Sequence, residues 1–275
     1  MGWLQSMIYG FVSGFAEFTP VSAPAHEAMM RRIFGTELLS LQQLLIHLGV
    51  LAALLFACKP QLERIHRERS LMRVPPRRRR RQPDGRSLAD YKLMKSVTVL
   101  LLLSLLLYPK TSQLGGNLGV TAALLMVNGF LLFLPQHLPS GNKDARSLSR
   151  LDGVLIGLSG ALAVLPGISR IGAVSSTAMA RGTDRQYAIQ LSLLVSLPVL
   201  TVLLVFDVIG IATAGLTGIS FLLVLQSLLS ALMAWAGATC AIAMVRFLAV
   251  KAGLSGFAYY SWGAALFSFI LFLMT

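Results

Sequence analysis

The stretch that decides the fold lies near the N-terminus and reads GFAEFTPVSAPAH, residues 14–26. It is apolar enough for a membrane, yet it contains two prolines and carries Glu17, Ser22 and His26. Proline removes a helix hydrogen bond and ends or kinks a helix, so the stretch predicts turns in place of one continuous span. Ionisable side chains inside a membrane are costly, which makes them candidates for a functional site.

A second stretch, GALAVLPGISR at residues 160–170, has the same layout. In both stretches a glycine precedes a proline by six residues, and a serine follows the proline. We expect two related halves, about 1–138 and 152–275, each with a helical hairpin that enters the membrane without crossing it. An inverted repeat of this kind brings the ends of broken helices together at the midplane. Chance similarity of two membrane segments is the alternative. The two sets of residues are Gly14, Pro20 and Ser22, and Gly160, Pro166 and Ser169.

The composition is that of an integral membrane protein. Of the 275 residues, 55% are hydrophobic and 13% charged, against about 25% charged in soluble domains, and the mean hydropathy is +0.71. A membrane span needs about 20 apolar residues. The sequence therefore predicts one all-α polytopic domain, with about six transmembrane helices beside the two hairpins. The apolar runs lie at 38–57, 93–108, 118–134, 187–206, 208–245 (expected to break at 210–218) and 254–274.

Positive charge is concentrated in one connection between two spans. Residues 59–92 hold twelve Lys or Arg and four Asp or Glu, a net charge of +8. Basic loops mark the cytoplasmic side and attract anionic lipid headgroups. We therefore predict a cytoplasmic loop here, and we expect no nucleic-acid partner. Cys58 and Cys240 lie far apart in apolar segments, which predicts free thiols.

Arg170 and Glu17 are isolated charges of opposite sign. No charged residue occurs at 153–169 or 171–180, and none precedes Glu17. A guanidinium in such a segment must face a partner or a wet cavity. The two groups either form a structural ion pair between the hairpins or belong to a functional site.

The PGISR segment favours a functional site. Gly167 permits close approach of the backbone, Ser169 supplies a hydroxyl group, and the Arg170 guanidinium is a fork of donors that matches phosphate oxygens. Such a clamp binds phosphate, whereas hydrolysis also needs a nucleophile or activated water and a proton donor. The candidates for these further roles are Glu17, Ser22 and His26.

Two histidines leave alternatives open at this stage. His26 is either catalytic or a buried imidazole that is merely hydrogen-bonded. His47, in the segment LLIHLG, either lines the cavity or bonds a backbone carbonyl group.

Two motifs resemble those of the bacterial undecaprenyl-diphosphate phosphatases, the bacitracin-resistance family. SGFAEFTPVSAPAH is similar to the family motif EGxTEFLPVSSTGH, and LAVLPGISRIGA is similar to LAxxPGxSRSGxT. The similarity continues through LLIHLGVLAALLF, LSLLVSLPVL and GFAYYSWGAALF, so that it covers nearly the whole chain.

The resemblance implies a polytopic inner-membrane enzyme with inverted repeats, two re-entrant hairpins and a site that opens to the outer face. It implies removal of the terminal phosphate of undecaprenyl diphosphate, or a related isoprenoid diphosphate, to recycle the carrier lipid for cell-wall polymers. A divalent cation, Mg²⁺ or Ca²⁺, is implied as well, with the lipid and the bilayer as partners. A homodimer is left open.

The same resemblance assigns roles to individual residues. Glu17 would bind the metal or activate water, and His26 would act as nucleophile or proton donor. Arg170 would neutralise the phosphoryl charge, so that Glu17, His26 and Arg170 form the expected catalytic set. The expected phosphate-binding residues are Ser22, Gly167, Ser169 and Arg170.

Several positions depart from the family pattern. Ser13 stands in place of the first acid and Ala23 in place of the second serine, while Gly160 and Ile171 replace a glutamine and a further serine. These departures leave a second hypothesis open, a homologue that binds or translocates the lipid phosphate without hydrolysing it. A purely structural membrane protein is a third hypothesis, and it leaves Glu17 and Arg170 unexplained. Two further departures are Pro24, for a threonine, and Ser261, for a C-terminal arginine.

Overall fold

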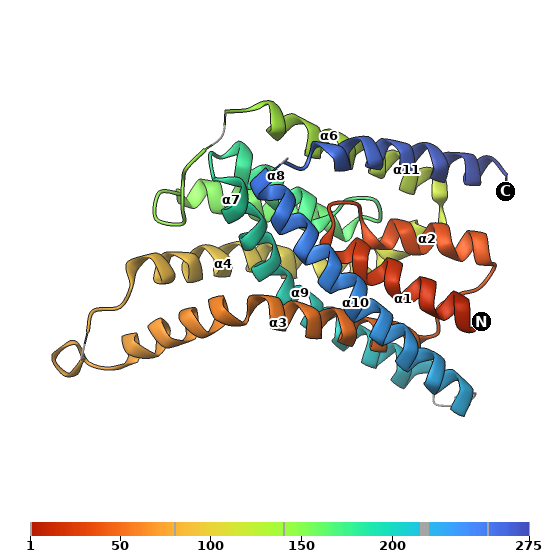
Figure 1. The fold of residues 1–275 in the computed structure, drawn as a ribbon, viewed down its shortest axis with the longest axis horizontal. Coiled ribbons are helices and arrows are strands. Elements are labelled where there is room, and N and C mark those ends of the chain that lie inside the picture. The colour runs from red at the N-terminus through yellow and green to blue at the C-terminus, as the bar shows by residue number, and fades with distance from the viewer. Residues whose placement is uncertain (1, 80, 140, 215–219, 252, 275) are drawn as a thin grey trace.

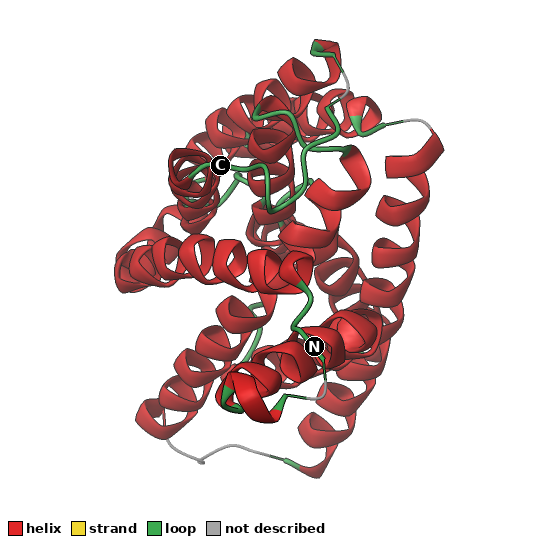
Figure 2. Ribbon diagram, turned by 90° about the vertical axis from the view of Figure 1, so that its left-hand side faces the viewer, coloured by secondary structure: helices red, strands yellow, loops and turns green. Residues whose placement is uncertain are grey.

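The computed structural model describes residues 2–79, 81–139, 141–214, 220–251 and 253–274. Within these ranges the chain is helical without a β-strand, as Figure 2 shows, and only an isolated bridge joins Lys143 to Thr183. The predicted all-α architecture is confirmed. The α-helices are α1 (Trp3–Phe18), α2 (Ala23–Phe34), α3 (Ser40–Arg73), α4 (Gly85–Ser104), α5 (Tyr108–Thr111), α6 (Leu118–Phe133), α7 (Arg150–Ala161), α8 (Arg170–Ala180), α9 (Arg185–Ala214), α10 (Phe221–Lys251) and α11 (Ser255–Leu273).

Short 3₁₀ segments extend or join several of these helices. They are η1 (Pro76–Arg78), η2 (Leu105–Leu107), η3 (Ser112–Gly116), η4 (Leu134–His137) and η5 (Leu162–Val164).

The predicted spans correspond to observed helices. Five segments are long and apolar enough to cross a membrane: 40–73, 85–116, 185–213, 221–250 and 255–273. The shorter apolar helix α6 is the sixth predicted span. Of the predicted break at 210–218, residues 210–214 still belong to α9, and the remainder lies outside the described residues; α10 begins at Phe221. The chain is therefore a multi-pass membrane protein.

The basic connection differs from its prediction as a loop. Helix α3 continues to Arg73 and α4 begins at Gly85, so most of residues 59–92 is helical. In Figure 1 these two helices extend together to the left of the molecule. The reason is local propensity, because Leu, Glu, Gln and Arg are good helix formers beyond the end of the apolar run. Asp84 caps α4 by accepting hydrogen bonds from the amides of Arg86 and Ser87, and the Ser87 hydroxyl group, with these amides, lowers the pKa of Asp84.

Two helical hairpins stand where the sequence predicts them. The first is α1 and α2, and the second is α7 and α8 with η5 between them. A helix of 16 residues is about 24 Å long, which is shorter than the hydrocarbon core of about 30 Å. In each half of the chain a hairpin is followed by long helices, so the order of elements repeats. The inverted relation of the two halves stays a prediction.

Small residues allow α1 to pack directly on α10. A Cβ atom on Gly10 would collide with the backbone of Ser230, and one on Gly14 would collide with that of Ala234. Close approach of this kind replaces the hydrophobic driving force that is missing between helices in lipid. Figure 1 shows α10 crossing α1, while α6 and α11 lie side by side at the top. The first hairpin is thereby held against the second half of the chain.

Candidate active site

The tips of the two hairpins meet inside the protein. The Ser22 hydroxyl group accepts a hydrogen bond from the Gly167 amide at 3.1 Å, and the Ser169 hydroxyl group donates to the Thr19 carbonyl at 3.2 Å. Both of these hydrogen bonds between the two tips are buried. The expectation that the two motifs face each other is confirmed.

Asn128 of α6 joins both tips, and the sequence analysis did not identify it. Its side-chain amide donates to the Pro20 carbonyl and to the Ser261 hydroxyl group, both at 3.0 Å. Its carbonyl oxygen accepts from the Ser169 amide at 2.9 Å. A fully buried asparagine with satisfied hydrogen bonds fixes the relative position of the two turns. Ser261, which replaces the arginine of the family pattern, is thus a buried acceptor.

The backbone at both tips has unusual dihedral angles. Ser22 has a φ of 68°, and it is the one described non-glycine residue with a positive φ. Gly167 has a φ of 131°, and an added Cβ atom there would press on Leu124 and on the backbone of Leu125. Backbone strain of this kind is found at functional sites, where the surrounding structure maintains it.

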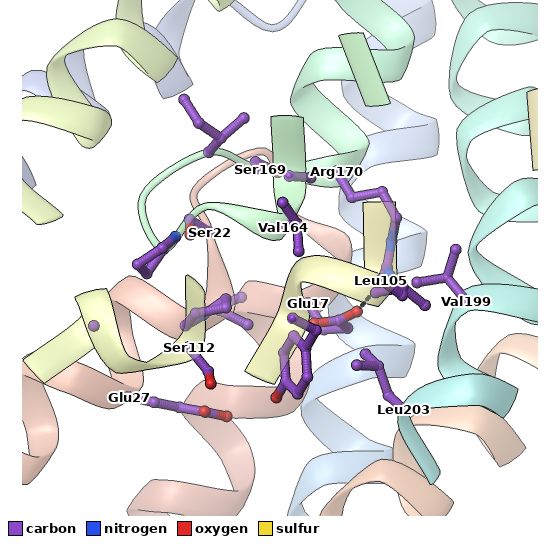
Figure 3. Close-up of a pocket in the computed structure, with 18 of the residues that line it drawn as sticks. Glu17, Ser22, Glu27, Leu105, Ser112, Val164, Ser169, Arg170, Val199 and Leu203 are labelled. Carbon is purple, nitrogen blue, oxygen red and sulfur yellow. Dashed lines mark hydrogen bonds and ion pairs between the residues drawn. The ribbon is translucent and has the colours of Figure 1, made fainter. Parts of the chain in front are cut away.

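A cavity of about 150 Å³ lies beneath the two tips. Its wall includes Glu17, Ser22, Ser169 and Arg170, which Figure 3 shows as sticks. Apolar side chains such as Leu203 complete the wall. Four of the predicted site residues are therefore brought together from two hairpins that are far apart in the sequence.

Arg170 and Glu17 form an ion pair across the cavity wall. The two side chains are 11% and 13% exposed, and Figure 3 shows them pointing toward one another. The Arg170 Nε donates to the Ser196 hydroxyl group at 3.1 Å, which orients the guanidinium from α9. Arg170 is also the first residue of α8, so the positive end of that helix dipole lies at the same place. The structural ion pair between the hairpins is confirmed. Both groups also line the cavity, and their part in a functional site stays a prediction.

Glu27 is a cavity residue that the sequence analysis missed. Its carboxylate makes no ion pair among the described residues, and its electrostatic neighbours include Glu17, His47 and Arg31. The hydroxyl group of Ser13 lies near this carboxylate but has no hydrogen bond of normal length. Ser13 stands where the family pattern has an acid, and Glu27 of α2 supplies a second carboxylate to the cavity wall beside Glu17 of α1.

His26 lies behind the tips and is absent from the cavity wall. Its Nδ1 is 2.8 Å from the Ser22 carbonyl oxygen, and its Nε2 is 2.7 Å from the Tyr260 hydroxyl group. The two rings are stacked with centroids 5.7 Å apart. The geometry matches the hydrogen-bonded alternative for this imidazole, and a catalytic role for His26 stays a prediction.

His47 lines the cavity and pairs with an acid. Its Nδ1 lies 2.5 Å from the Asp207 carboxylate of α9. Of the two alternatives for this histidine, the cavity position is confirmed, but its partner is a carboxylate instead of a carbonyl group. Asp207 was missed, although a lone acid within the apolar run 186–213 is the same kind of signal that identified Glu17.

The remaining departures from the family pattern fall into two groups. Ala23 and Gly160 are part of the cavity wall, whereas Ile171 is fully buried in the helix core. An added Cβ atom on Gly160 would meet Leu101 and Val174, both at 2.8 Å. A glutamine at position 160 would therefore require these two side chains to move.

Comparison with known proteins identifies the family. A family model described as "Bacitracin resistance protein BacA" matches residues 6–267. The chain belongs to this family. It is 30% identical to an undecaprenyl-diphosphatase of Methanobrevibacter smithii over 95% of each chain. It is 29% identical to one of Carboxydothermus hydrogenoformans over 95% of this chain and 94% of the relative, and 26% identical to one of Alkaliphilus metalliredigens over 95% and 96%.

The side chains around the cavity fit a divalent cation that is shared with a substrate. Among the described residues, no three His, Cys, Asp or Glu side chains gather into a cage. Mg²⁺ is commonly held by one or two carboxylates together with substrate phosphates and water. Glu17 and Glu27 both line the cavity and match that donor set.

Proposed function

We propose that this protein hydrolyses undecaprenyl diphosphate, or a related isoprenoid diphosphate, to the monophosphate and inorganic phosphate. The observation that carries the proposal is the Arg170 guanidinium at the start of α8, in a cavity within a membrane domain. Membership of a family whose relatives carry the name undecaprenyl-diphosphatase supports this substrate class.

The cavity has the groups that bind a terminal phosphate. Arg170 would exchange part of its contact with Glu17 for the phosphoryl oxygens, because a guanidinium binds phosphate through two parallel hydrogen bonds. The α8 dipole and the hydroxyl groups of Ser22 and Ser169 add to this site. In the transition state charge spreads over the phosphoryl oxygens, where Arg170 stabilises it.

A divalent cation, when bound, would neutralise further charge on the diphosphate. Glu17 and Glu27 would hold the cation from the two helices of the first hairpin, α1 and α2. The family resemblance assigns His26 a role at phosphorus, and this role requires the imidazole to leave its contact with the Tyr260 hydroxyl group. The prenyl chain would extend into the lipid.

At the level of the cell, we propose that the reaction returns the carrier lipid to the synthesis of cell-wall polymers. The site would open toward the outer face of the cytoplasmic membrane, and the basic end of α3 and α4 would lie in the cytoplasm, following the positive-inside rule. A role in bacitracin resistance is part of the proposal, because the description of the matching family model names it.

The test is release of inorganic phosphate from undecaprenyl diphosphate by the purified protein in detergent. Mg²⁺, Ca²⁺ and a chelator are compared, with Arg170→Ala and His26→Ala as variants. Arg146→Ala is the matched control, since Arg146 pairs with Asp144 in an exposed loop. We expect release that requires Arg170 and survives Arg146→Ala. No release under any condition, with lipid binding that still depends on Arg170, would instead support the binding or translocating homologue.

A further inference from the structure

A buried histidine–aspartate pair joins α3 to α9 beside the cavity. His47 Nδ1 and Asp207 Oδ2 lie 2.5 Å apart, and the two side chains are 10% and 11% exposed. Residues 186–213 contain no other charged side chain. An acid within a membrane helix is expensive unless it has a partner, and the imidazole of His47 is that partner.

The bond to Asp207 leaves one ring nitrogen of His47 for other partners, and His47 forms part of the cavity wall. A carboxylate only accepts hydrogen bonds, so the bond to Asp207 assigns the proton of neutral His47 to Nδ1. The other nitrogen, Nε2, is then an acceptor, and its neighbour is the side-chain amide of Gln43 at 3.4 Å, also part of the cavity wall. In His26, by contrast, both ring nitrogens are held at 2.8 Å and 2.7 Å.

We propose that His47, oriented by Asp207, is the general base that activates the attacking water; this inference rests on the proposed phosphatase function. His47 Nε2 takes a proton as the water oxygen bonds to the terminal phosphorus. The bond from phosphorus to the bridging oxygen breaks, and the electron pair leaves with the lipid monophosphate. The proton passes from His47 to solvent, and inorganic phosphate is released.

The surroundings of His47 favour this role over that of a simple helix-to-helix contact. Asp207 stabilises the imidazolium that forms when the ring takes a proton, as the aspartate of a catalytic triad does. The same cavity contains Arg170, which places the phosphate, so base and anion-binding group share one compartment. A contact that served only to join α3 and α9 would not need the ring to form part of the cavity wall.

The charged and titratable groups that face His47 come from several elements. Asp207 lies on α9, Glu27 on α2 and Glu17 on α1. Tyr108 of α5 and Arg170 of α8 line the same cavity. A general base must be neutral, so the rate should fall as the pH drops and His47 becomes protonated.

The test measures phosphate release by His47→Gln and Asp207→Asn. His137→Gln, which changes an exposed histidine, is the control. General base catalysis contributes about 10²- to 10⁴-fold. We therefore expect kcat for phosphate release to fall about 100-fold or more in His47→Gln, with less than about a threefold change in the Kd for the lipid. The fall in rate at low pH should disappear from the residual activity of this variant, which a purely structural role would not cause. Asp207→Asn should lower kcat in the same direction, and His137→Gln should leave it unchanged.

Three outcomes overturn the inference. Phosphate release that survives His47→Gln refutes the base while leaving the proposed function intact. A rate per folded molecule that equals the parent's, with the folded fraction measured by thermal unfolding, refutes it as well. Absence of release from the parent protein refutes both proposals together. If the variants do not fold, the solvent deuterium isotope effect on the parent enzyme decides, since a value of one excludes proton transfer in the rate-limiting step.

Discussion

Two carboxylate–guanidinium pairs hold the hairpins, and they differ in how far their hydrogen bonds are satisfied. Asp152 of α7 binds Arg181 at 2.5 Å and also accepts from the amide and hydroxyl groups of Ser149, both at 2.9 Å. The Arg181 side chain is 40% exposed to the surroundings. Glu17 of α1 binds Arg170 of α8, and both side chains face the cavity.

The comparison separates a structural ion pair from one that can exchange partners. The Asp152 carboxylate accepts from three donors, two on Ser149 and one on Arg181. It is not part of the cavity wall. The Arg170 guanidinium retains donors that point toward a cavity, where an anion can replace part of its contact with Glu17. The same two functional groups therefore stabilise the fold in one place and are available to a ligand in the other.

The largest effect is expected at Arg170. Arg170→Ala should lower phosphate release by about 10³-fold or more, because an arginine that neutralises phosphoryl charge contributes that much. Arg170→Lys should recover only a small part, since lysine lacks the planar fork. Phosphate release and thermal unfolding are measured on the same preparations. Near-normal phosphate release from folded Arg170→Ala would show that the Glu17–Arg170 pair is as purely structural as the Asp152–Arg181 pair.

Glu17→Gln should have the next largest effect and should split binding from turnover. Removing the carboxylate frees the Arg170 guanidinium, so inorganic phosphate should bind more tightly. Turnover should fall about 100-fold, because the proposed cation loses one of its ligands. Isothermal titration with phosphate and the release assay measure the two effects separately. Weaker phosphate binding in Glu17→Gln would show that the Glu17 carboxylate helps to hold Arg170 for phosphate and does not compete with phosphate for the guanidinium.

Arg181→Ala should affect stability more than activity. Loss of one charged hydrogen bond to Asp152 should lower the free energy of unfolding by about 1–3 kcal/mol, while the bonds from Ser149 remain. Activity per folded molecule should stay within about twofold of the parent. Denaturant or thermal unfolding in detergent provides the measurement. A large loss of activity without loss of stability would place Arg181 in the functional site.

The smallest effect is expected for a third pair at the end of α3 and α4. Glu68 is buried and binds Arg81, whose side chain is 48% exposed, and it also accepts from the Asp84 amide at 2.9 Å. The Arg81 end of the pair is exposed and screened by salt, and without it Glu68 still has the Asp84 amide and Arg67 as partners. Arg81→Gln should leave phosphate release unchanged and should shift the thermal unfolding temperature slightly, less so at high salt. A change in phosphate release would show that this distant segment between α3 and α4 is coupled to the cavity.

Prediction from the sequence succeeded where a residue type was unusual for its surroundings. Glu17 and Arg170 were found because they are isolated charges in apolar sequence, and the hairpins because Pro20 and Pro166 break helices. Asp207 carries the same signal and was overlooked. Glu27 has no such signal, because it precedes Arg31 and Arg32 in a segment that looks like an ordinary polar helix end.

The sequence by itself determined that this is a helical membrane protein with two interrupted hairpins and an isolated arginine in apolar surroundings, because hydropathy, proline and buried charge act locally. Only the tertiary structure decided that Arg170 meets Glu17, that Asn128 joins the two tips, and which histidine reaches the cavity. In the sequence His26 carries the stronger signal, because it lies in the first motif, and His47 the weaker one. Their difference in the structure depends on Tyr260 and Asp207, residues more than 150 positions away, and such contacts arise only when the helices pack.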